Sequence, residues 1–215
     1  ISGTYTVQSG AAFASNGTLD LTGGTVTMTG TTVLMHGTSG SILGNGQTFN
    51  HLTIGDGADT ITVSTSDLTV AGTLSIGHAS AVLSISSGRT VTANSTVTLT
   101  GTISGAGRLT YAHSATFPTT GTISSILRFD ATNTNQDVPE RTYGGAVEFY
   151  SGSSSNARVI TMGTDSGQIL TFAGDVSLLA NGSQNLTVDA GPNAPLILIT
   201  GDLDFTGTGG GNEVI

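Results

Sequence analysis

Two carboxylates lie three positions apart in a Gly-rich segment, GDGADTIT at residues 55–62. The segment fits the last eight positions of the calcium-binding nonapeptide GGxGxDxUx, in which Asp side chains and backbone carbonyls supply oxygen ligands. Such sites need tandem copies, so that ligands converge from neighbouring turns, and residues 63–71 do not repeat the motif. The sequence therefore offers Asp56 and Asp59 as a calcium hypothesis, but it favours a solvated turn.

Three aspartates form a second group that could do chemistry. Asp202 and Asp204 alternate in GDLDF, so their side chains share one face of a strand. Asp175 occupies the position equivalent to Asp202 in a related segment, and stacking of the two segments would gather three carboxylates. Polysaccharide-cleaving β-helices use paired carboxylates, but no Arg lies near these residues in sequence. We favour a charged edge that opposes unwanted strand pairing.

Other catalytic or metal-binding patterns are missing from the sequence. The four histidines have no HxH or HxxxH spacing, which leaves a histidine metal cluster unsupported. No GxSxG elbow is present, and separate Ser, His and Asp residues do not establish a triad. We therefore predict neither catalytic nor cofactor-binding residues. The histidines are His36, His51, His78 and His113.

The charge balance disfavours anionic partners. Five Arg and no Lys face fourteen carboxylates, which gives a net charge of −9. No basic patch is available to neutralise phosphates, so nucleic-acid binding is disfavoured, as is docking on an anionic membrane. Cys is absent, and no apolar run approaches the length of a membrane span.

The elements that would position these residues are short strands. A nine-residue pattern recurs as LTVAGTLSI at 68–76, VTLTGTISG at 97–105, LTFAGDVSL at 170–178 and ILITGDLDF at 197–205. Alternation of apolar and small polar residues is a strand signal, and the central Gly indicates a bend between two short strands. Repetition predicts an all-β fold, a β-solenoid (parallel β-helix) with coils of roughly 20–30 residues, with an antiparallel β-sandwich as the alternative.

The repeats recur in order within two longer modules. The modules span about residues 47–105 and 141–206, and a polar segment, RFDATNTNQDVPE at 128–140, separates them. We predict one continuous solenoid over residues 1–215, with segment 128–140 as a protruding loop. Matching positions pair Phe49 with Tyr143, Leu68 with Leu170, and Leu83 with Leu186.

These Gly- and Thr-rich repeats resemble the β-helical repeats of bacterial secreted passengers and surface adhesins, the autotransporter and filamentous-haemagglutinin-like proteins. The closest local match is GTISGAGRLTY at 101–111, which resembles a passenger repeat beginning Gly-Thr-Ile-Ser-Gly-x-Gly. The match is partial, because YAH follows where that repeat has a basic residue and Gly. The resemblance implies export and a surface role, and it implies no catalytic residue.

We therefore expect a non-enzymatic extracellular or cell-surface protein that serves as a fibre subunit, stalk or adhesin. Neither end of the sequence reads as a cap: residues 1–7 are strand-like, and residues 207–215 form a Gly run with a short apolar tail. Uncapped ends are expected if the sequence is a fragment of a longer rod, or if the ends pair with further copies of the chain by strand addition, and we favour the second interpretation. The alternatives are a carbohydrate-active β-helix, either a polysaccharide lyase or a tailspike-like hydrolase, and a module that binds surface glycans.

Overall fold

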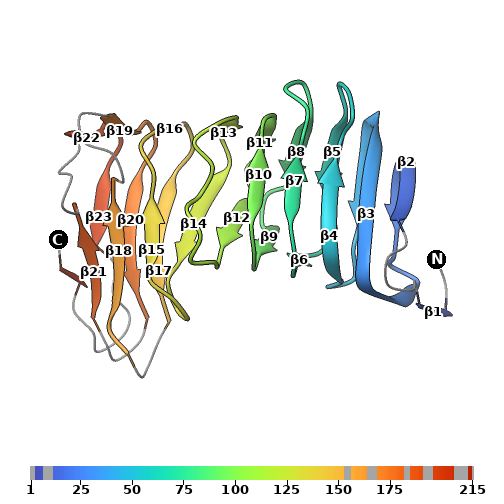
Figure 1. Ribbon diagram of the computed structural model, residues 1–215, viewed down its shortest axis with the longest axis horizontal. Helices are drawn as coiled ribbons and strands as arrows, with labels where there is room; N and C mark the ends of the chain where they lie inside the picture. The colour runs from blue at the N-terminus through green and yellow to red at the C-terminus, as the bar shows by residue number, and fades with distance from the viewer. Residues whose placement is uncertain are drawn as a thin grey trace. The chain divides into compact units, whose positions relative to one another are not determined.

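The computed structural model describes residues 3–6, 12–152, 156–163, 169–181, 185–190, 196–205 and 213–214 (Figure 1). The chain divides into two compact units. The N-terminal unit comprises Ile1–Leu109 and Thr120–Ser125, and the C-terminal unit comprises Thr110–Thr119 and Ile126–Ile215. The tail at 207–215, to which the sequence assigns a role in association, lies outside the described residues except for Glu213 and Val214.

The described residues form strands, turns and bends, with no helix among them. Accordingly, no helix able to cross a membrane is found in the described part of the chain. The N-terminal unit contains β1 (Gly3–Thr6), β2 (Ala12–Asp20), β3 (Gly24–Leu43), β4 (Thr48–Ile54), β5 (Thr60–Val63), β6 (Leu68–Val70), β7 (Leu74–Ile76), β8 (Val82–Ile85), β9 (Thr90–Ala93), β10 (Val97–Leu99), β11 (Thr102–Ser104) and β13 (Thr122–Ile123).

The C-terminal unit consists of a further set of strands, and β12 (Arg108–Tyr111) has residues in both units. The C-terminal strands are β14 (Ile126–Asp130), β15 (Gln136–Val138), β16 (Thr142–Tyr143), β17 (Val147–Ser151), β18 (Arg158–Met162), β19 (Ile169–Phe172), β20 (Val176–Ala180), β21 (Leu186–Asp189), β22 (Leu196–Ile199), β23 (Leu203–Phe205) and β24 (Glu213–Val214).

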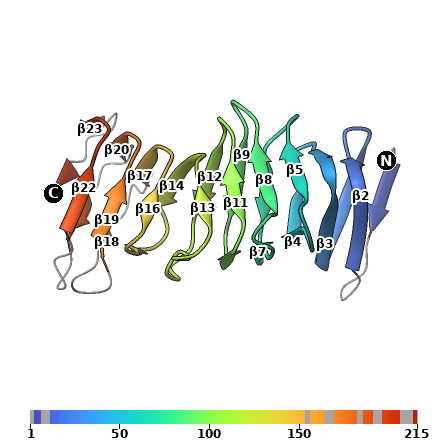
Figure 2. The same ribbon diagram turned by 90° about the horizontal axis from the view of Figure 1, so that it is seen from above.

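Every described strand pair is parallel and joins one turn of a coil to the next (Figure 2). Leu52 of β4 is opposite Leu74 of β7, which in turn is opposite Val97 of β10. Hydrogen bonds that a side chain forms with the neighbouring turn join residues between 20 and 28 positions apart in sequence. The β-solenoid prediction is therefore confirmed, with about 7 turns among the residues that the structure describes. The antiparallel β-sandwich alternative is wrong, because such a sandwich requires antiparallel neighbours.

The core follows the alternation in the sequence. In the first copy of the nine-residue pattern, Leu68, Val70, Leu74 and Ile76 are at most 1% exposed, and the residues between them are partly exposed. The inward row places apolar side chains of successive turns on top of one another, which removes them from water and provides the main stabilising term. Outward positions carry hydroxyls, such as Thr18 and Ser41, whose Oγ atoms are 3.0 Å apart.

The glycine in the middle of the pattern is required for close stacking. Gly72, Gly101, Gly174 and Gly201 lie at corners between two strands, and none has a positive φ. A Cβ on Gly72 would lie 2.5 Å from the carbonyl oxygen of Asn50, in the preceding turn. A Cβ on Gly201 would lie 2.6 Å from the carbonyl oxygen of Gly174, the equivalent corner one turn earlier. The glycines are therefore needed because adjacent backbones touch at the corner, not because the bend has a left-handed conformation.

Segment 128–140 lies partly in strands, which corrects the prediction that all of it forms a protruding loop. Residues 128–130 belong to β14 and residues 136–138 to β15, and the other residues of the segment connect strands. Phe129 and Val138 point inward and are fully buried. The polar residues made the segment look like a loop, but Arg128 forms an ion pair with Glu148 of the next turn, Nε to Oε2 2.6 Å. Charged residues at outward positions therefore fit the stack.

Six aromatic side chains form a continuous ladder through the core of the C-terminal unit. Ring centroids lie 5.1 Å apart for Tyr111 and Phe117, 5.7 Å for Phe117 and Phe129, and 6.0 Å for Phe129 and Tyr143. Phe149 and Phe172 extend the ladder into the next turns. All six rings are at most 1% exposed, and most pairs meet edge to face, which is a favourable arrangement for aromatic rings.

The two tyrosines of the ladder make the C-terminal unit sensitive to alkali. Burial raises the pKa of Tyr111 from 10.0 to about 12, and burial also raises the pKa of Tyr143. Both hydroxyls donate hydrogen bonds to backbone carbonyls, Tyr111 to Ala115 at 2.7 Å and Tyr143 to Pro139 at 3.1 Å. Because the unfolded chain loses these protons first, the stabilising contribution is complete below pH 10 and is lost between pH 10 and about 12.

We therefore expect the urea midpoint of unfolding to fall between pH 9.5 and pH 12, and Tyr111→Phe to reduce that fall. Phe cannot ionise, so the variant removes one of the two groups that couple unfolding to proton release. Equal falls in wild type and variant would contradict a role for Tyr111.

Candidate functional site

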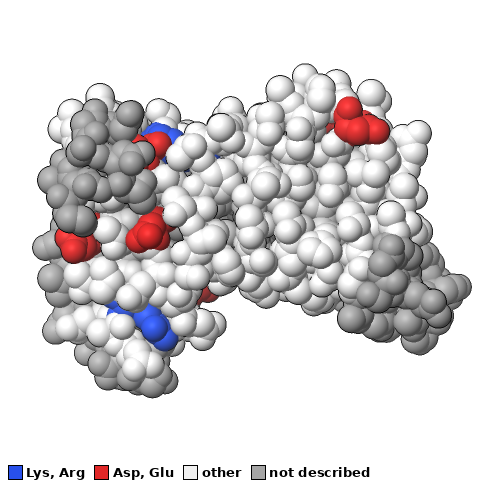
Figure 3. Space-filling view, in the orientation of Figure 1, with Lys and Arg blue, Asp and Glu red and all other residues white. Residues whose placement is uncertain are grey.

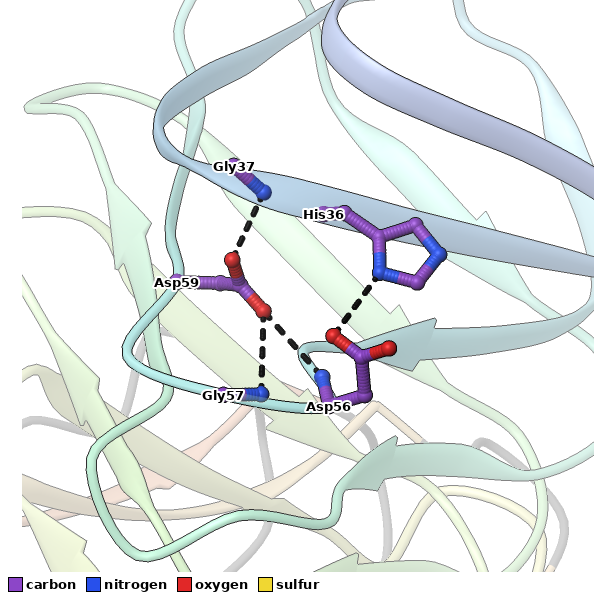
Figure 4. A network of polar contacts seen from close by, with 5 residues as sticks. All are labelled: His36, Gly37, Asp56, Gly57 and Asp59. Atoms are coloured by element: carbon purple, nitrogen blue, oxygen red, sulfur yellow. Dashed lines mark hydrogen bonds and ion pairs between the residues drawn. The ribbon is translucent and has the colours of Figure 1, made fainter.

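A polar cluster connects two successive turns of the N-terminal unit (Figure 4). His36 and Gly37 lie in β3, and Asp56, Gly57 and Asp59 lie in the connection between β4 and β5. The connection begins at Gly55, whose φ of 73° is in the left-handed region. A Cβ at Gly55 would lie 2.7 Å from the Cβ of Ala81 and 3.1 Å from Oδ2 of Asp59. The Gly at this position therefore shapes the loop that carries both aspartates.

Asp59 holds the loop against the preceding turn. Its Oδ1 accepts a hydrogen bond from the backbone N–H of Gly37 at 2.7 Å. Its Oδ2 accepts hydrogen bonds from the N–H groups of Asp56 at 3.1 Å and Gly57 at 3.2 Å. The residue is only 7% exposed, and no Arg or His pairs with its carboxylate within the described residues. Three backbone donors thus compensate a buried negative charge, which is the usual way to stabilise an unpaired carboxylate.

Asp56 lies beside Asp59 but faces solvent. Its Oδ1 is 3.0 Å from Nδ1 of His36, and the exposed fractions of the two side chains are 74% for Asp56 and 23% for His36. The hydrogen bond from His36 is the main cause that lowers the pKa of Asp56 below its ordinary value of 3.8. Asp56 is therefore ionised at neutral pH, and two carboxylates share one small region.

The cluster has the donor atoms of a cation site. One ligand atom from each of His36, Asp56 and Asp59 lies within 4.8 Å of the others. An open depression in the surface, lined also by Asn16 and Thr38, gives solvent access to these atoms. The structure thus brings together the two aspartates that the sequence singles out, although calcium binding remains a prediction.

His36 is the member of the cluster that sequence reasoning missed. The sequence contains no short histidine motif, because His36 and Asp56 are 20 residues apart and meet only across one turn of the coil. Gly37 and Asp59 are 22 residues apart and meet in the same way. A search for metal-binding residues at the spacing of one turn would have found the cluster.

Of the three aspartates that the sequence groups together, Asp175 joins two successive turns. Oδ1 of Asp175 accepts a hydrogen bond from the backbone N–H of Asp202 at 3.0 Å, which confirms that the two residues are equivalent in successive turns. Asp204 is opposite Ser177 and is exposed. Among the described residues, these three carboxylates do not form a metal-type cluster with ligand atoms within 4.8 Å of one another. The paired-carboxylate hypothesis for these residues stays a prediction.

The remaining histidines and several arginines bind backbone groups. In each of the three histidines outside the cluster, the imidazole Nδ1 accepts a hydrogen bond from a backbone N–H. The donors are Thr73 for His51, Ser80 for His78 and Ala115 for His113. Arginine side chains donate to backbone carbonyls in an earlier part of the coil: Arg89 to Thr65, Arg141 to Pro118, and Arg158 to Thr132. His51 and the three arginines thus join successive turns, whereas His78 and His113 hold local bends two residues long.

Comparison of the chain with models of protein families, with curated protein sequences and with solved structures yields no match. The resemblance to passenger and adhesin repeats therefore remains a local similarity of sequence. The β-solenoid itself rests on the strand pairing described above.

Proposed function

We propose that the chain is an extracellular structural protein, a β-solenoid subunit of a surface fibre, stalk or adhesin that associates end to end. The solenoid fold supports a scaffold role, because stacked turns build an extended surface without a dedicated cavity. The surface supports it as well: Figure 3 shows one face on which charged side chains are sparse. Only 9% of all residues are charged.

The observation that carries this proposal is the apolar face of the last described turn in the C-terminal unit. Leu203 and Phe205 of β23 continue the inward rows of Val176 and Leu178 in β20. Val176 and Leu178 are at most 2% exposed, whereas Leu203 is 44% and Phe205 is 49% exposed. The side chains at these two inward positions are thus buried in β20 but exposed to solvent in β23.

The physical chemistry of this face fits a further turn of the same kind. The face combines apolar side chains with the edges of parallel strands, whose N–H and C=O groups are arranged for one more strand. A further turn of the same type satisfies both requirements, because it supplies inward apolar residues and a parallel backbone. A second copy of this chain provides such turns, and repeated head-to-tail addition along one axis gives an open polymer.

We expect Phe205→Asp to reduce concentration-dependent association of the purified chain, measured by sedimentation velocity and by negative-stain electron microscopy. Burying a carboxylate at the end of the stack carries a large desolvation cost. The matched control is Leu196→Asp, because Leu196 is 65% exposed but lies beside Ile169 on the outward side of β22. Far-UV circular dichroism verifies that both variants retain the β fold.

End-to-end association predicts that Phe205→Asp lowers the proportion of polymers and that Leu196→Asp leaves it unchanged. The reverse result would assign association to the side of the solenoid. A wild-type chain that stays monomeric at all concentrations would overturn the self-association proposal.

A further inference from the structure

We propose that His36 and Asp56, supported by Asp59, bind a divalent transition-metal ion of the Zn²⁺ type between two successive turns of the N-terminal unit. This site is independent of the end-to-end contact, because its residues lie in β3 and in the connection between β4 and β5. The bound ion would clamp the two turns together at their outer surface.

The distance between the two main ligand atoms fits one ion. Nδ1 of His36 and Oδ1 of Asp56 are 3.0 Å apart. Two ligand atoms that are each about 2.1 Å from a tetrahedral Zn²⁺ ion are themselves about 3.4 Å apart. The hydrogen-bonded pair would therefore have to open by only a few tenths of an ångström to hold the ion, with the proton of the neutral imidazole on Nε2.

The local charge favours a cation. Asp56 is ionised and exposed, and Asp59 contributes a second carboxylate that is 7% exposed and has no cationic side-chain partner among the described residues. Backbone N–H groups of Gly37, Asp56 and Gly57 fix the orientation of the Asp59 carboxylate. A fixed, partly desolvated negative charge attracts a divalent ion more strongly than a freely solvated one.

The shape of the site allows an ion to enter and to keep water ligands. The depression that contains the three side chains is open to solvent and includes Asn16 and Thr38 at its rim. Water fills the coordination positions that the protein leaves open in Zn²⁺ sites that are not fully enclosed.

The ligand types distinguish Zn²⁺ from Ca²⁺. Calcium prefers six to eight oxygen ligands, and two carboxylates with one imidazole nitrogen fall short of that number and type. An imidazole nitrogen is a favourable ligand for Zn²⁺ and its neighbours in the first transition row. The histidine therefore changes the expected ion from the calcium that the aspartates alone indicate.

The test is isothermal titration calorimetry of the full chain in a buffer that does not chelate metals. ZnCl₂ and CaCl₂ are titrated in separate experiments. We expect one Zn²⁺ per chain, and binding weaker by about tenfold or more in His36→Ala and in Asp56→Asn. His113→Asn is the control, because His113 lies in the C-terminal unit and Asn retains an acceptor for the N–H of Ala115. Thermal unfolding with and without Zn²⁺ gives a second measurement, since an ion that binds only the folded chain raises the melting temperature.

Loss of the Zn²⁺ signal in both cluster variants, with retention in His113→Asn, supports the site. Equal Zn²⁺ binding by wild type and Asp56→Asn would overturn it, as would tighter binding of Ca²⁺ than of Zn²⁺. Circular dichroism establishes whether each variant is folded, and the isosteric Asp56→Asn substitution keeps the test valid if His36→Ala fails to fold.

Discussion

Phe129→Ala is expected to lower the free energy of unfolding by about 3–5 kcal/mol, the range for removal of a fully buried aromatic ring. Phe129 is the centre of the aromatic ladder, where its ring contacts those of Tyr111, Phe117, Tyr143 and Phe149. Removal of the ring leaves a cavity that four rigid neighbours cannot fill. Urea unfolding followed by tyrosine fluorescence measures the change.

Tyr150→Ala is the matched control for this substitution. Tyr150 is also an aromatic residue of the C-terminal unit, but its side chain faces outward and contacts the guanidinium of Arg128, with 4.5 Å between the Arg128 Cζ and the ring centroid. Loss of a partly exposed cation–π contact costs about 1 kcal/mol. A cost for Phe129→Ala no larger than that for Tyr150→Ala would show that the ladder does not stabilise the unit.

Gly72→Ala is expected to lower the free energy of unfolding by about 2–3 kcal/mol, a typical cost of overpacking. The new Cβ would lie 2.5 Å from the carbonyl oxygen of Asn50 and 2.6 Å from the ring of His51. The backbone at this position cannot retreat without stretching the strand pairing on both sides, because Gly72 connects β6 and β7. Equilibrium unfolding in urea gives the magnitude.

Gly57→Ala provides the comparison within the same unit. A Cβ at Gly57 has no heavy atom within 4 Å, and φ is not in the left-handed region. The substitution keeps the N–H that donates to Asp59, so we expect a change within about 0.5 kcal/mol. If Gly57→Ala destabilises the chain as much as Gly72→Ala does, the close approach of backbones is not the reason for the corner glycines.

The fold could be predicted because its determinants are local. Alternation sets which residues face inward, and the structure buries Leu68 and Leu74 as the pattern predicts. The role of Gly72 could not be obtained in this way, because the backbone that it touches belongs to another turn. Segment 128–140 was misjudged for a related reason: Arg128 and Glu148 compensate each other across one turn, and each looks unpaired in sequence.

The candidate site was predicted only in part. The Gly-rich connection with Asp56 and Asp59 is a local signal, and this connection supplies the two carboxylates of the cluster with His36. The contribution of His36 depends on the length of one turn, which varies along the chain between 20 and 28 residues in the contacts described. Register between turns is thus the information that a single sequence lacks, and it decides both the ligand set and the expected ion.

The corner glycines have a consequence for how such a chain can vary in length. Gly174 and Gly201 stand one above the other in successive turns, and each corner fits only if the backbone beneath it has the same path. An insertion or deletion of one complete turn preserves that fit, whereas a change of one or two residues at a corner displaces every strand that follows. We therefore expect tolerated length variants of this protein to differ by whole turns, with small insertions confined to the connections that lie away from the glycine corners.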